Sequence, residues 1–96
     1  MLHIISKTST LNDPMNQISD YINPSDTILL TQDAIYLVYQ NNAQLLSFIE
    51  LGVSVYALEP DVLARGMDNT QSGLVNLIDF KGFVELTTSR NKSLSW

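Results

Sequence analysis

The segment Val53–Gly66, with the sequence VSVYALEPDVLARG, decides the fold that this chain predicts. Its first half, up to Leu58, is a short apolar run rich in β-branched and aromatic residues, which is typical of a strand covered on both faces. Pro60 then favours the first turn of a helix, and acidic neighbours on each side suit the positive helix end. Arg65 and the final glycine are suited to a helix end. A strand that leads directly into a helix predicts a parallel sheet.

Working outward from this segment, strand and helix patterns alternate along the chain. Apolar runs predict four strands and a short edge strand, at Leu2–Ile5, Thr27–Thr31, Val53–Leu58, Leu74–Ile78 and Ser93–Trp96. Apolar residues at spacings of three and four predict the helices between them, at Pro14–Ile22, Gln32–Val38, Ala43–Leu51, Glu59–Arg65 and Phe80–Thr87. The polar stretch Asp68–Gly73 is expected to be a loop. Residues 1–96 are therefore expected to form a single α/β domain.

The composition excludes several classes of function. The net charge is −5, and the five basic residues are scattered, so no basic stripe is present that would bind nucleic acid directly. The sequence has no cysteine, which excludes disulfides, thiolate metal sites and a thiol nucleophile. A single histidine leaves little scope for metal binding, and no metal site is expected.

No apolar run approaches the roughly 18 residues of a membrane span, and no basic region precedes the apolar residues at the amino end. We therefore expect neither a membrane span nor a signal peptide, and a cytoplasmic location. A chain of 96 residues has a thin core, and the predicted helices give a parallel sheet little cover. Another chain is expected to cover one of its apolar surfaces.

Four acidic residues follow predicted strands and so are expected at the carboxyl edge of the sheet, where α/β proteins bind ligands: Asp33, Glu59, Asp61 and Asp79. One interpretation is a magnesium or phosphoryl site. Each residue also lies at a predicted helix start, where a carboxylate accepts free amide hydrogens. We favour this second interpretation, in which they cap helices or serve the structure.

Two other features have a functional and a structural interpretation. The hydroxyl-rich loop from Ser6 to Thr10 is similar to a flavin phosphate loop, but it lacks the glycine that lets a backbone approach a phosphate, so no cofactor is expected. His3 has no serine or cysteine partner at motif spacing and is expected to be structural rather than catalytic. Tyr36, Tyr39, Tyr56 and Trp96 are candidate interface anchors, and for Tyr56 packing in the core is an equal alternative.

Several segments, taken in order, resemble the TusB/DsrH family along the whole chain. They are Met1-Leu2-His3, Ile28–Asp33, Val55-Tyr56-Ala57-Leu58 leading to Ala64-Arg65-Gly66, Leu77-Ile78-Asp79-Phe80 with Phe83, Val84 and Leu86, and the final Trp96. The resemblance implies a small flavodoxin-like (DsrEFH-like) α/β domain with a four- or five-stranded, mainly parallel sheet flanked by helices. Tyr56, Ala57, Arg65, Gly66 and Trp96 are its family-motif positions.

The same resemblance implies a subunit of a cytoplasmic sulfur relay, in a heterohexamer with TusC-like and TusD-like subunits, that supports 2-thiolation of the tRNA wobble uridine. In that family TusD carries the relay cysteine. Some DsrH-type relatives have a cysteine in the first helix, but this chain has the sequence MNQISDYI at residues 15–22. The resemblance therefore implies a non-catalytic accessory subunit that stabilises the cysteine-bearing carrier.

The alternative is a flavodoxin-like domain that binds a nucleotide or flavin and so owns a ligand site. A phosphoryl receiver is disfavoured, because a receiver needs paired acidic residues after the first strand and this chain has Lys7 there. Visible absorbance of the purified protein distinguishes the flavin-binding alternative from the accessory subunit.

Overall fold

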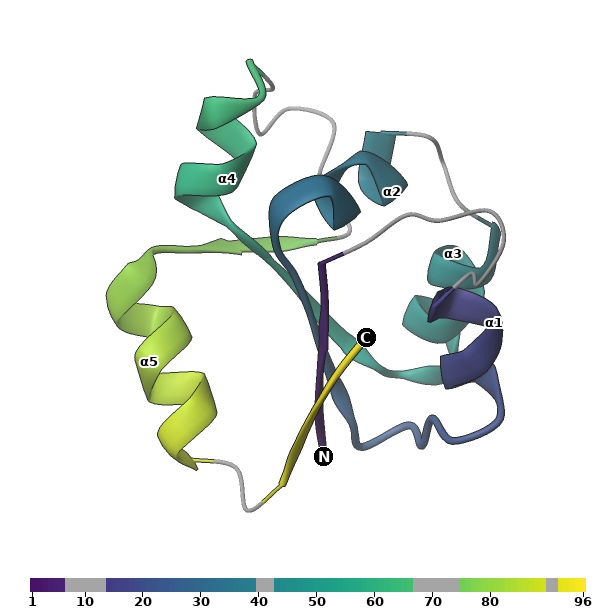
Figure 1. Ribbon diagram of the computed structural model, residues 1–96. Coiled ribbons are helices and arrows are strands. Elements are labelled where there is room, and N and C mark those ends of the chain that lie inside the picture. Colours follow the sequence, from purple (N-terminus) through teal and green to yellow (C-terminus); the bar gives the residue numbers. More distant parts are fainter. Residues whose placement is uncertain (7–13, 40–42, 67–74, 90–91) are drawn as a thin grey trace.

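The computed structural model describes residues 1–6, 14–39, 43–66, 75–89 and 92–96 (Figure 1). Within these ranges five strands form one sheet: β1 (Leu2–Ile5), β2 (Thr27–Leu30), β3 (Ser54–Leu58), β4 (Asn76–Ile78) and β5 (Ser93–Ser95). The α-helices are α1 (Pro14–Ser19), α2 (Tyr36–Tyr39), α3 (Ala43–Leu51), α4 (Glu59–Ala64) and α5 (Phe80–Ser89), and the 3-10 helix η1 is Gln32–Ile35. The expected α/β class is confirmed.

The sheet has the order β4-β3-β2-β1-β5, and every pair of neighbouring strands is parallel. The chain crosses from β1 to β4 in one direction and then returns past β1 to form β5. Because parallel crossovers are right-handed, the first three crossovers place their helices on one face and the last places α5 on the other. Figure 1 shows this separation, with α1 and α3 on one side of the strands and α5 on the opposite side.

The main core lies on the face that α1 and α3 cover. Side chains of paired residues in a parallel sheet share a face, so the row Ile5, Leu30 and Ala57 points to this side. These residues belong to one buried cluster with Ile18 of α1 and Phe48 of α3. Val55 and Ala57 of β3 are buried on this face and Leu58 on the other, which explains the apolar run that begins at Val53.

The opposite face is covered by α5. Leu2 and Leu29 on this face are fully buried, but Ile4 and Tyr56 remain partly accessible. The helix itself buries no residue completely, and Phe80 keeps 64% of its surface exposed. This face is therefore the less completely covered of the two.

Most expected elements are present, with differences at their ends. The first helix ends at Ser19 rather than Ile22, because the amides of Tyr21 and Ile22 both donate to the carbonyl of Ile18 and close the turn. The second helix begins as the 3-10 turn η1. The expected break at residues 41–42 and the expected loop at 68–73 lie outside the described residues.

Glycine suits the local geometry at two helix ends. Gly66, which follows α4, has a φ of 68°, in the left-handed region that residues with a Cβ seldom adopt. Gly82 lies in the first turn of α5, where an added Cβ would come within 3.2 Å of the Ile78 Cβ. The absence of a side chain at Gly82 thus lets α5 pack closely against the end of β4.

Candidate functional site

The carboxyl edge of the sheet brings together two of the four predicted acidic residues. Arg65 Nη2 donates to Asp33 Oδ1 at 3.1 Å, and Arg65 Nη1 donates to the carbonyl of Asp61 at 3.2 Å. The Asp61 carboxylate accepts the amide hydrogen of Gln32 at 2.8 Å. These bonds join the 3-10 helix after β2 to the helix after β3.

Three of these residues do not cap the helices in which they lie, so the structural alternative stays the prediction for them. The N-cap positions of η1 and α4 are Thr31 and Leu58, and neither makes a side-chain cap hydrogen bond. Asp33, Glu59 and Asp61 lie inside the first turns instead, where their charge faces the helix dipole. At α4 the cap position holds the apolar Leu58, and at η1 the Thr31 hydroxyl donates to the carbonyl of Ile5 instead of capping the helix.

Asp79 has a different environment. It directly precedes α5, and its Oδ1 accepts the amide hydrogen of Gly82 at 2.8 Å, three residues along the chain. This is the geometry of a side-chain N-cap.

The carboxyl-edge cluster has limited scope for ligand chemistry. Asp33 is already paired with Arg65, and within the described ranges no group of three or more histidine, aspartate or glutamate side chains is placed to hold a metal ion. Gln32 has a φ of 50°, an uncommon value for a residue other than glycine. The hydrogen bond from its backbone amide to the Asp61 carboxylate helps to hold this conformation. The hydrogen bonds of this cluster link η1 to α4. Residues 7–10 of the hydroxyl-rich loop lie outside the described residues.

A second polar cluster lies at the amino end of the first two strands. Asp26 directly precedes β2 and is buried, and its Oδ1 accepts a 3.0 Å hydrogen bond from the Met1 ammonium group. Its Oδ2 lies 3.0 Å from Nε2 of the fully buried His3 and accepts the amide hydrogen of Asn23 at 3.1 Å. The expected structural role of His3 thus has a specific partner in this cluster.

The hydrogen bond from Trp96 determines the tautomer of His3. The indole Nε1–H donates to His3 Nδ1 at 3.2 Å, and an indole nitrogen is a donor only. Nδ1 must therefore be the acceptor, so the ring proton resides on Nε2 and is donated to Asp26. The chain Asp26–His3–Trp96 connects the start of β2 to the residue that follows β5.

Burial alone would raise the pKa of Asp26, because it disfavours the charged carboxylate. The hydrogen bonds from His3, from the Met1 ammonium and from the Asn23 amide act in the opposite direction, as does the ammonium charge. Their sum holds the pKa of Asp26 below its ordinary value. The carboxylate in this cluster is consequently ionised at neutral pH.

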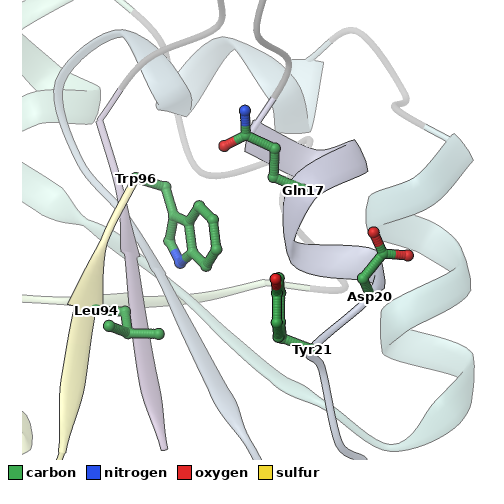
Figure 2. A pocket seen from close by; sticks show the side chains of 5 residues that line it. All are labelled: Gln17, Asp20, Tyr21, Leu94 and Trp96. Carbon is green, nitrogen blue, oxygen red and sulfur yellow. The ribbon is translucent and has the colours of Figure 1, made fainter.

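Next to this network is an open pocket of about 350 Å³ between α1 and β5. Figure 2 shows its lining residues, with the Trp96 indole directed from the end of β5 towards α1. They are Gln17, Asp20, Tyr21, Leu94 and Trp96. Tyr21 and Trp96 also lie near each other, with ring centroids 6.2 Å apart. The pocket thus has apolar and aromatic walls with a polar rim.

The remaining family-motif positions have ordinary structural environments. Tyr56 is half-buried on the face that α5 covers, Ala57 is buried in the main core, and Gly66 ends α4. Asp26 was not predicted from the sequence. The available signal is its place one residue before β2, opposite Met1 when Leu2 pairs with Thr27.

The fold and these sites define a class of protein. It is a small α/β protein with a parallel five-stranded sheet, structural polar clusters at both ends of the strands, and an open pocket beside an edge strand. The solution NMR structure of protein Tm0979 from Thermotoga maritima is similar to it, with a TM-score of 0.66 and 25% identity over 96% of this chain and 97% of that one.

The sequence comparisons identify the family. The model of the family described as "DsrH like protein" matches residues 8–93. Proteins named TusB from Buchnera aphidicola, Photorhabdus laumondii and Escherichia coli K12 are 34%, 33% and 31% identical, and each match covers the whole of both chains. The chain belongs to the DsrH-like family, as the sequence resemblance predicted.

Proposed function

We propose that this chain is a non-catalytic, TusB-like subunit of a cytoplasmic sulfur relay complex. In this proposal it assembles with TusC-like and TusD-like subunits in a heterohexamer and stabilises the cysteine-bearing carrier, which supports 2-thiolation of the tRNA wobble uridine. The observation that carries the proposal is the full-length likeness to proteins named TusB. Membership of the DsrH-like family supports a role in sulfur relay.

The residue content supports an accessory role rather than a carrier role. A sulfur carrier holds persulfide sulfur on a thiolate, and the sequence contains no cysteine. In α1, where some DsrH-type relatives have a cysteine, the residues are PMNQIS. The polar clusters at the two ends of the sheet are occupied by internal hydrogen bonds, which fits a structural use.

Exposed apolar side chains support assembly with other chains. Phe80 and Val84 of α5 lie one helical turn apart and are exposed, as are Leu63 of α4 and Leu94 of β5. Apolar residues gathered on one helix face are typical of a surface that another chain covers. Within the described residues, no helix is both long and apolar enough to cross a membrane.

Co-purification tests the proposed assembly. The chain is produced with a cleavable tag, together with the TusC-like and TusD-like proteins of its own genome. We expect all three to elute as one complex on size-exclusion chromatography, with a mass by light scattering that corresponds to two copies of each. Elution of this chain apart from both others, when those two are folded and soluble, would contradict the proposal.

A further inference from the structure

Within the described residues, the edge strand β5 pairs with another strand on one side only, which leaves backbone groups free beside the pocket. In the described sheet β5 pairs with β1 on one side, through hydrogen bonds that use the carbonyl of Lys92 and the amide and carbonyl of Trp96. Hydrogen-bonding groups alternate between the two sides of a strand in a parallel ladder. The amides and carbonyls of Ser93 and Ser95 therefore face the free edge, where another strand can pair with them.

The pocket lies where side chains of an added strand would reach. Leu94 of β5 and Trp96, directly after the strand, are two residues apart, so both side chains lie on the face that α1 covers, and both line the pocket. Tyr21 is 65% exposed and forms the opposite wall. Side chains of an extended segment alternate, so one apolar side chain of a strand paired with β5 would enter this pocket.

The pocket wall is held in place before any segment binds. The Trp96 indole donates to His3, which donates to the buried Asp26. This chain of bonds restricts the rotation of the indole. A wall that is already ordered loses less conformational entropy when a partner binds.

Charge favours a cationic segment at the pocket. Asp20 is exposed at the rim, and the chain as a whole carries a net charge of −5. Lys92 directly precedes β5 and would repel a cationic group there. The preference for a cationic segment therefore applies to the carboxyl end of β5, near the pocket. A second copy of the same acidic chain would place like charges together, which disfavours self-pairing at this edge.

We propose that β5 and the pocket bind an extended segment of a partner protein. The segment adds a strand next to Ser93–Ser95, inserts an apolar side chain between Tyr21 and Trp96, and places a lysine or arginine beside Asp20. This inference deepens the proposed function by naming a surface for a partner chain, and it depends on that function only for the identity of the partner.

The lone tryptophan of the chain provides the readout, because Trp96 lines the pocket. The probe is an acetylated and amidated heptapeptide of alternating threonine and valine with one central lysine, and the matched peptide has glutamate in place of lysine. We expect a saturable change in Trp96 emission with the lysine peptide and binding weaker by about three- to tenfold with the glutamate peptide.

Two variants locate the effect. Asp20→Lys is expected to reverse the preference between the two peptides, while Leu51→Ser, an exposed substitution at the end of α3, is expected to leave both affinities unchanged. Amide exchange measured by NMR should slow at Ser93 or Ser95 when the lysine peptide is bound. The proposal is overturned if neither peptide gives a saturable change at millimolar concentration, or if Asp20→Lys leaves the preference unaltered. Because no relay subunit is present, this result is independent of the co-purification experiment.

Discussion

Asp26 connects groups that are distant in the sequence. Its carboxylate accepts hydrogen bonds from the Met1 ammonium, from His3 and from the Asn23 amide, and His3 in turn accepts one from Trp96. These contacts hold the first strand, the start of the second and the residue after the last in one arrangement. A single buried carboxylate thus orders both the interior strand β1 and the edge strand β5.

Replacing this carboxylate is expected to be costly. Asp26→Asn keeps the shape of the side chain but removes the charge that faces Met1 and His3, so we expect the free energy of unfolding to fall by about 1–3 kcal/mol. Urea denaturation followed by Trp96 fluorescence measures this loss. Asp20→Asn is the matched control, because its carboxylate is exposed, and it is expected to change stability by less than about 0.5 kcal/mol. Equal losses in the two variants would contradict the role assigned to Asp26.

The same residue predicts a dependence of stability on pH. Its pKa is lower in the folded chain than in the unfolded chain, so the unfolded chain binds a proton more readily. The stabilisation is present above about pH 3.9, the ordinary aspartate pKa, and is lost as the pH falls through the lower pKa of the folded state. We expect the unfolding free energy to decrease below about pH 4 more steeply in the wild type than in Asp26→Asn. Parallel pH profiles for the two proteins would show that Asp26 makes no such contribution.

At the level of single residues, the sequence predicts fewer of the polar contacts than the structure shows. The expected structural role of His3 follows from its place in an apolar strand without a catalytic partner, but Asp26 carries no motif that marks it. Its partners Met1 and His3 lie more than 20 residues away in the sequence, and His3 is bonded in turn to Trp96 at the other end of the chain. Pairing between such distant segments depends on strand register. The ion pair between Asp33 and Arg65 could not be predicted for the same reason, because 32 residues separate the two in the sequence.

The two helices that follow β2 and β3 depend on each other through Asp61. Its carboxylate accepts the first amide of η1, so Asp61→Ala is expected to cost about 0.5–2 kcal/mol, the usual range for losing a helix cap. Asp33→Ala is expected to cost less than about 1 kcal/mol, because Asp33 is 67% exposed in its ion pair with Arg65. Thermal unfolding of both variants in the same buffer compares them. A larger loss for Asp33→Ala than for Asp61→Ala would be inconsistent with this assignment.

Helices and strands could be predicted well from local patterns. The apolar run that ends at Leu58 and the proline that follows it placed β3 and α4 within one residue of their observed limits. The ends of α1 and η1 were less accurate, since a turn centred on Ile18 and a left-handed Gln32 depend on contacts with other segments. Propensity describes a helix interior better than the point where the helix meets the rest of the fold.

The distribution of helices over the two faces of the sheet depends on the direction of the crossovers between its strands. Three successive right-handed crossovers fill one face, and α5 is left to cover the other face (Figure 1). Strand order could not be predicted from the sequence, because each crossover can move to either side without a change in the local pattern. The order nevertheless explains the exposed Phe80 and Val84, since a single helix provides the cover on that face of the described sheet.

The central claim is that this chain serves a sulfur relay without carrying sulfur. The direct measurement is to supply radioactive sulfur to a relay reconstituted from this chain, the TusC-like and TusD-like subunits and the remaining relay proteins, and to separate the subunits without reductant. We predict label on the cysteine-bearing subunit and none on this chain, and lower tRNA thiolation when this chain is omitted. Stable label on this chain would contradict the claim, as would unchanged thiolation and unchanged partner assembly in its absence.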